Sequence, residues 1–256
     1  MNFEIRGKTS SIAWVATINP ANFTPDWFKY NKILTSENCD LANTTINGNS
    51  VCCDFGWCEI IATKNKVLFR LTHDGRTQEF IDLVVSTISL MNTVKSYGLG
   101  LNSQIQVSIG SFDNFHKVGN SIIPKDIFYD SNKSKLLDEK ELHIGMISCR
   151  IAIEDRDAIK EEKISENKKN KTSPKQSENK IIYQDKVILD IKGMDEDENG
   201  IKHGIEFSFN HHIASIKNKE IALTELIPEI ITGHFIKEMA ANEDTARNII
   251  ERILNV

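Results

Sequence analysis

The sequence predicts an α+β fold in which an antiparallel sheet carries helices packed on one face. Three observations predict it. Several segments alternate apolar and polar residues, which is the pattern of strands with one buried face. Two of these segments, 57–63 and 66–72, are separated only by Lys64 and Asn65, as in an antiparallel hairpin. Apolar residues then recur with helical spacing over 77–97 and again in the C-terminal part of the chain, so helices can cover one face of the sheet.

The first elements lie before residue 50. Ile12, Trp14, Ala16 and Ile18 share one face of an extended segment, which predicts a strand over 10–18. The sequence Thr-Pro-Asp at 24–26 then predicts a short helix, because Thr can cap it, Pro tolerates its first position and Asp suits the positive end of its dipole. Residues 35–50 are rich in Asn, Thr, Ser and Gly, and we interpret them as a loop.

The middle of the chain contains the most regular helical pattern. After the hairpin, Thr77 is a candidate N-cap, and the helix is predicted over 77–97 with Gly98 just past its end. Alternating apolar residues over 99–109 predict the next strand. Residues 111–140 follow, and we interpret them as short helices and loops that begin at Ser111.

The C-terminal part of the chain shows the same kinds of strand and helix pattern. We predict strands over 142–154, 181–192 and 203–213, and then a helical tail over 220–254. Thr224 and Asn242 are candidate N-caps, so we expect two helices in this tail.

The order of elements suggests two halves. We expect an N-terminal α+β half, 1–140, and a C-terminal α+β half, 141–256, each with three strands and a helix as in a duplicated β-β-β-α unit. The C-terminal half would contain a mobile insertion at 158–180. Within it, residues 160–180 hold seven Lys and four Glu with almost nothing apolar, a composition that cannot compensate the entropy cost of ordering.

Composition excludes several classes of protein. The 256 residues include 40% hydrophobic and 26% charged residues with a net charge of −5, which excludes a wholly disordered chain, a coiled coil and a disulfide scaffold. The first twenty residues lack a secretory signal pattern, and no stretch is apolar enough to span a membrane. We therefore expect a cytoplasmic protein without a membrane partner, whose five cysteines are free thiols.

The most specific motif is an acidic loop. Asp195, Asp197, Asn199 and Glu206, with Gly200 between them, match the spacing of an EF-hand calcium loop, in which oxygens at alternating positions surround the ion. An EF-hand needs flanking helices, whereas strands are predicted on both sides here. A solvated hairpin turn explains the same residues, and we prefer it. We predict no cofactor.

Two further groups of residues carry alternative functions. Lys168, Lys169 and Lys171 in the basic insertion could contact phosphates of a nucleic acid, although aromatic residues for base stacking are missing there. His211 and His212 end a strand and would point to opposite faces of the sheet, so they cannot bind one metal together. A hydrolase with dispersed residues could use either histidine, with Glu206 or Glu225 as the nearest acidic candidates in sequence.

One stretch resembles a known family. Residues 57–102 contain a strand pair, a long helix with Phe80 and Leu83, and the sequence Gly-Leu-Gly-Leu-Asn at 98–102. This combination resembles a sporadically distributed family of uncharacterised bacterial accessory proteins of about 250 residues. The resemblance implies an accessory role, with a place in a bacterial defence or mobile-element system, and it implies no catalytic residues.

The function we predict from these observations is that of a non-catalytic interaction or regulatory protein. No nucleophile elbow, phosphate-binding loop or zinc-protease motif is present, so we assign no catalytic residues. Long strands leave sheet edges that must be covered or paired, which favours a protein partner or self-association. A nucleic-acid-associated protein and a hydrolase remain the alternatives.

Overall fold

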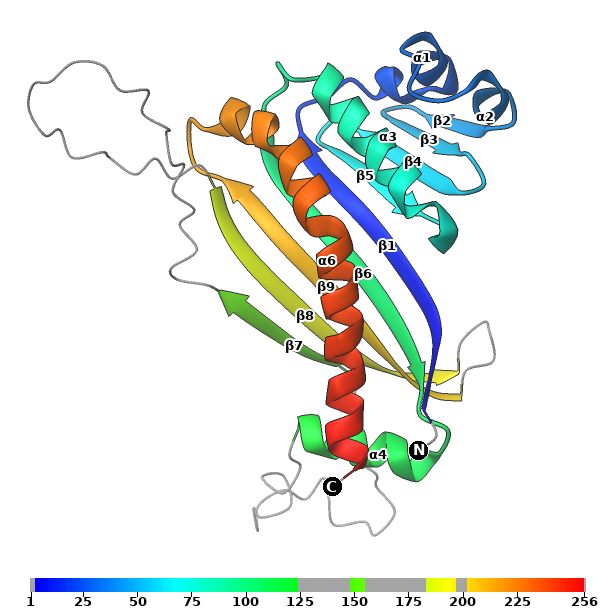
Figure 1. The fold of residues 1–256 in the computed structure, drawn as a ribbon, viewed down its shortest axis with the longest axis vertical. Coiled ribbons are helices and arrows are strands. Elements are labelled where there is room, and N and C mark those ends of the chain that lie inside the picture. Colours follow the sequence, from blue (N-terminus) through cyan, green and yellow to red (C-terminus); the bar gives the residue numbers. More distant parts are fainter. Residues whose placement is uncertain (1–2, 124–147, 155–182, 197–201, 256) are drawn as a thin grey trace, which may run out of the picture.

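The computed structural model describes residues 3–123, 148–154, 183–196 and 202–255. Its strands form one nine-stranded antiparallel sheet in the order β2-β3-β4-β5-β1-β6-β9-β8-β7, which confirms the predicted α+β class (Figure 1). The strands are β1 (Glu4–Ala16), β2 (Asn43–Asn47), β3 (Ser50–Asp54), β4 (Cys58–Thr63), β5 (Lys66–Leu71), β6 (Ser96–Ser108), β7 (Ser148–Glu154), β8 (Tyr183–Glu196) and β9 (Lys202–Ser215). The α-helices are α1 (Pro25–Tyr30), α2 (Ser36–Asp40), α3 (Thr77–Leu90), α4 (Phe112–Ile122) and α6 (Glu220–Leu254), and the 3₁₀ helices are η1 (Pro20–Phe23) and η2 (Asp74–Arg76).

Strands from both predicted halves belong to this one sheet. The long strands β1 and β6 lie side by side at its centre, β5 pairs with the other edge of β1, and β9 pairs with the other edge of β6. The β4–β5 and β8–β9 hairpins were both predicted, and both are present as antiparallel pairs. Among the described helices none is long and apolar enough to span a membrane.

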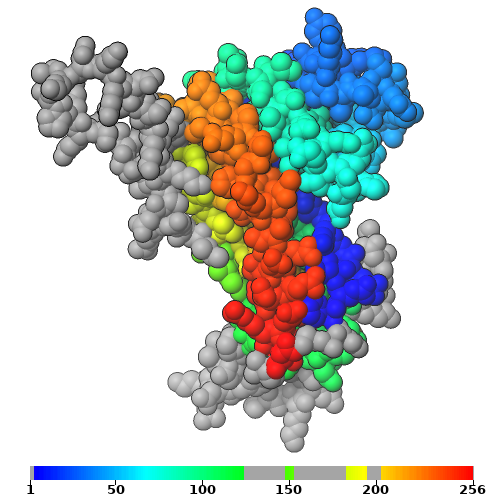
Figure 2. All heavy atoms as spheres, in the orientation of Figure 1, coloured from blue at the N-terminus to red at the C-terminus, as the bar shows by residue number. Residues whose placement is uncertain are grey.

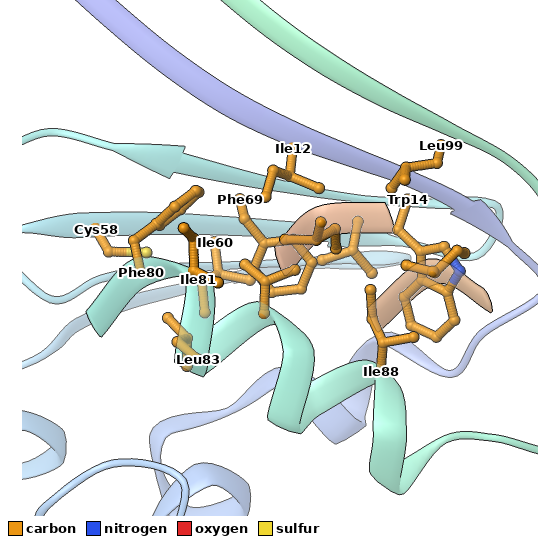
Figure 3. Packing of buried hydrophobic residues seen from close by; sticks show 14 of the residues in the cluster. Ile12, Trp14, Cys58, Ile60, Phe69, Phe80, Ile81, Leu83, Ile88 and Leu99 are labelled. Atoms are coloured by element: carbon orange, nitrogen blue, oxygen red, sulfur yellow. The ribbon is translucent and has the colours of Figure 1, made fainter. Parts of the chain in front are cut away.

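The helices α3 and α6 pack on the same face of the sheet (Figure 1). The larger core lies beneath them, where alternate residues of β1 such as Ile12 and Trp14 are fully buried. Figure 3 shows Phe80 and Ile88 of α3 pointing toward the strands, as their helical spacing predicts. A second core joins the other end of the sheet to α4 and the last turns of α6. Burial of both cores orients α6 along the sheet.

The predicted pair of C-terminal helices is wrong, because α6 is one helix of 35 residues. Thr224 and Asn242 lie inside it, and their side chains bond the sheet instead of capping a helix. The Thr224 hydroxyl contacts Ser96 Oγ at 2.7 Å, and Asn242 Nδ2 donates to Ser103 Oγ at 2.9 Å. Both α6 residues are buried, so polar side chains that look like caps in the sequence hold α6 to β6.

Two further predictions need correction. Residues 35–50 form more than a loop: Thr35 caps the helix α2, and β2 turns into β3 at Gly48, whose φ of +53° suits a residue without a Cβ. The helix predicted over 77–97 ends at Leu90, and Thr77 is its first residue, with a hydroxyl that donates to the carbonyl oxygen of Asp74. The predicted cap Thr24 is confirmed at α1, and Ser111, where short helices and loops were expected to begin, caps α4. The insertion at 158–180 lies outside the described residues.

Candidate binding surface on the open face of the sheet

The face of the sheet opposite the helices carries mostly polar side chains near its centre. Because side chains alternate along a strand, the neighbours of the buried core residues point to this face, which we call the open face. In register across β1, β6 and β9 it presents Ser11, Asn102 and Asn210. All three are partly buried, although no described helix packs over them.

A cleft of about 310 Å³ lies among these strands. Hydroxyl and amide side chains predominate in its lining, with one charged residue from β5 and one from β8. The lining residues are Thr9, Ser10, Ser11, Arg70, Asn102, Ser103, Gln104, Asp190, Ser208, Phe209 and Asn210.

A row of hydrogen-bonded side chains crosses the cleft from β1 through β6 to β9. Thr9 Oγ1 donates to Gln104 Oε1 at 3.2 Å, and Gln104 Nε2 donates to Glu206 Oε1 at 3.1 Å. Gln106 Nε2 reaches the other carboxylate oxygen of Glu206 at 3.3 Å, and Ser208 Oγ donates to Oε1 at 3.3 Å. The row therefore fixes these side chains before any ligand is present.

The neighbouring row of Ser11, Asn102 and Asn210 makes fewer hydrogen bonds. Asn102 Nδ2 donates to Ser11 Oγ at 3.3 Å, whereas Asn210 Oδ1 is shielded from solvent and has no hydrogen-bond partner among the described residues. Gly100 lies beside them, and a Cβ built on it would lie 3.5 Å from Asn210 Oδ1. The absence of a side chain at Gly100 leaves space directly next to the unpaired carbonyl oxygen.

Two ion pairs stand at the flanks of the cleft. Arg70 Nη1 lies 2.6 Å from Glu59 Oε2, and Arg150 binds both carboxylate oxygens of Asp190 at 2.6 and 2.9 Å. The hydrogen bond to Asp190 raises the pKa of Arg150. Each guanidinium is matched by a carboxylate, so the cleft does not present an excess of positive charge to an anionic ligand.

The lining of this cleft offers mainly groups that exchange hydrogen bonds. None of its lining residues is a histidine or a cysteine. Cys52 lies outside the cleft on β3, and burial raises the pKa of its thiol, as does the neighbouring Glu59. Burial likewise raises the pKa of Cys39, Cys53 and Cys58, so none of these four thiols is activated as a nucleophile.

The two predicted histidines lie on opposite faces, as their spacing requires. His212 is paired with Gly100 of β6 on the open face. His211 faces the helices, where its Nε2 lies 2.5 Å from Asp185 Oδ1 and its Nδ1 lies 3.6 Å from Glu238 Oε2. The sequence had suggested other carboxylates, and it missed these two because the register of β8 against β9 and the position of α6 were unknown.

The predicted calcium ligands are only partly described. Strands β8 and β9 flank the acidic turn, as expected for a hairpin, and Glu206 lies within β9, where it accepts the hydrogen bonds described above. Asp195 is the last residue but one of β8, whereas Asp197 and Asn199 lie outside the described residues. Within the described ranges, no group of three or more His, Cys, Asp or Glu side chains could hold a metal ion.

The predicted nucleic-acid contacts, Lys168, Lys169 and Lys171, also lie outside the described residues. Comparison of the chain with models of protein families gave no match, and comparison with curated protein sequences gave none either. The family resemblance of residues 57–102 therefore stays a prediction.

Proposed function

We propose that this protein is a non-catalytic binding module that contacts a protein partner through the open face of its sheet. The observation that carries the proposal is the unpaired Asn210 Oδ1 in the cleft. A buried polar atom without a partner costs about 1–3 kcal/mol of stability. A donor group from a partner that entered the space beside Gly100 would remove this cost on binding.

The lining chemistry favours a protein partner. Amide and hydroxyl groups exchange hydrogen bonds with peptide groups and with polar side chains, whereas phosphates require an excess of Lys or Arg. The two arginines beside the cleft are already paired with carboxylates. Phe209, the one aromatic residue in the lining, is only 5% exposed and belongs to the core on the other face, so it is not a platform for stacking bases.

Copurification with matched variants tests the proposal. Tagged wild-type protein, Asn210→Leu and the control Asn92→Leu are expressed in cells of the source organism, and the retained proteins are quantified by mass spectrometry. Asn92 is exposed in the turn after α3 and is not among the residues that line the cleft, and its substitution changes the same chemical groups. We expect a partner that the wild-type protein and Asn92→Leu retain equally and that Asn210→Leu loses.

Two results would contradict the proposal. One is equal retention of every partner by Asn210→Leu and the wild-type protein. The other is binding that depends on nucleic acid, so that nuclease treatment abolishes it and replacement of Lys168, Lys169 and Lys171 by Ser does the same. That second result would favour the nucleic-acid alternative.

A further inference from the structure

The strand β2 is an unprotected end of the sheet. It pairs with β3 along one edge, no described element pairs with its other edge, and all five of its residues are exposed. Edge strands are commonly protected by lysine, by proline or by a covering segment. The sequence Asn-Thr-Thr-Ile-Asn at 43–47 contains neither a charge nor a proline. Its free backbone groups can therefore accept another strand.

The elements near the same edge carry exposed apolar side chains. Among the large hydrophobic residues that the structure describes, the three with the highest exposed fractions are Tyr30 at 86%, Leu41 at 76% and Ile46 at 64%. They come from α1, from the residue after α2 and from β2. These elements lie together at one end of the molecule, away from the C-terminus (Figures 1 and 2). Clusters of exposed apolar residues mark interaction surfaces.

The hairpin register shows which backbone groups of β2 are free. Asn47 and Ser50 flank the two-residue turn and exchange hydrogen bonds, and bonded and non-bonded pairs alternate along an antiparallel ladder. Thr45 therefore bonds toward Cys52, whereas the N–H and C=O groups of Thr44 and Ile46 point away from β3. These groups require a partner strand with the same alternation.

We propose that β2 pairs antiparallel with β2 of a second copy of this chain, across a two-fold axis at Thr45. In this register Thr44 of each copy lies opposite Ile46 of the other, so all the outward-pointing groups of both residues are satisfied. Thr45 lies opposite itself, and Asn43 lies opposite Asn47. The inference does not rest on the proposed function of the open face.

The sequence favours a second copy over an unrelated strand. Because the five-residue strand is nearly palindromic in polarity, the symmetric register places amide opposite amide at Asn43 and Asn47 and hydroxyl opposite hydroxyl at Thr45, and the remaining pair, Thr44 and Ile46, is uncharged. Beyond the strand ends, Ala42 and Leu41 lie opposite Gly48 and Asn49, so no like charges meet there either. The pairing would join two nine-stranded sheets into one continuous sheet.

A charge-pair experiment tests both the surface and the register. Thr45→Lys places two ammonium groups opposite each other at the axis, Thr45→Glu places two carboxylates there, and a mixture of the two variants places opposite charges there. Thr93→Lys, in the exposed turn after α3, is the control. Native mass spectrometry and light scattering measure the mass of each sample, and circular dichroism shows whether each variant is folded.

We expect the wild-type protein and Thr93→Lys to have twice the single-chain mass of 29.0 kDa. Each Thr45 variant should dissociate at concentrations at least about tenfold higher than the wild-type protein does, and an equimolar mixture should recover a heterodimer. A wild-type protein that stays a single chain would overturn the inference. Pairing of β2 with a strand of another protein instead of a second copy would overturn it too. Dimers that tolerate Thr45→Lys, or variants that do not recover on mixing, would overturn the proposed register.

Discussion

Thr224 fastens the first turns of α6 to the sheet, and its replacement by valine removes this polar connection with little change in shape. The hydroxyl accepts from the backbone N–H of Ser96 at 3.2 Å and contacts Ser96 Oγ at 2.7 Å. Ser96 Oγ in turn accepts from Trp14 Nε1 at 2.7 Å. All three residues are buried, with Thr224 only 1% exposed, so water cannot replace the lost partner.

The expected magnitude follows from this network. An orphaned buried N–H costs about 1–3 kcal/mol, and the lost hydroxyl contact costs about 1 kcal/mol more. Thr224→Val should therefore lower the free energy of unfolding by about 3 kcal/mol. For a domain of this size each kcal/mol corresponds to about 2–4 °C, so Tm should fall by about 6–12 °C.

A second threonine of α6 supplies the control. The hydroxyls of Thr224 and Thr232 each bond the carbonyl four residues earlier, Glu220 O at 2.9 Å and Pro228 O at 2.8 Å, but Thr232 is exposed. Thr232→Val should change the free energy of unfolding by less than about 0.5 kcal/mol. Urea titrations and thermal scans by circular dichroism measure both variants. Equal stability of the two variants would refute the reasoning, because the buried contacts to Ser96 would then contribute nothing.

Two other predictions concern backbone packing and pH. A Cβ on Gly98 would lie 3.0 Å from the backbone oxygen of Ile213, whereas the atom nearest to a Cβ on Gly100 would be 3.5 Å away. In urea titrations, Gly98→Ala should therefore lower the free energy of unfolding by about 1–2 kcal/mol and Gly100→Ala by less than about 0.5 kcal/mol. Equal losses would contradict this contact geometry. The hydrogen bond from Lys8 holds the pKa of Glu243 below its ordinary value of 4.5, and since the folded-state pKa is the lower one, this contribution is complete above pH 4.5 and disappears as pH falls through the folded value. Lys8→Met should therefore be less stable than the wild-type protein by about 0.5–1 kcal/mol at pH 7, and the difference should shrink as pH falls below 4.5. A difference that is independent of pH would exclude this pair as its source.

Local patterns predicted much of the fold. Alternation located β1, β6, β8 and β9, and the two-residue connection located the β4–β5 hairpin. The cap predictions failed where a polar side chain of α6 has a hydrogen-bond partner on another element. Thr224 and Asn242 resemble caps in the sequence, yet Ser96 and Ser103 of β6 bind them, and nothing local to α6 contains that information.

The order of the strands could not be predicted for a related reason. The pairing of β6 with β9 joins residues about a hundred positions apart, and several registers satisfy the same alternation. The candidate site depends on that register, because it brings Ser11, Asn102 and Asn210 into one row. Each is an ordinary polar residue of a strand in the sequence. The unpaired oxygen of Asn210 becomes evident only when its neighbours are placed.

The most direct test of the central claim is the free energy of unfolding of Asn210→Leu without any partner, measured by urea titration beside Asn92→Leu. If Asn210 Oδ1 is reserved for a partner, its removal relieves an unpaired buried group, and the variant should be as stable as the wild-type protein or more stable by up to about 1–3 kcal/mol. A loss of more than about 1 kcal/mol would contradict the account, because it would show that the Asn210 amide supports the fold itself.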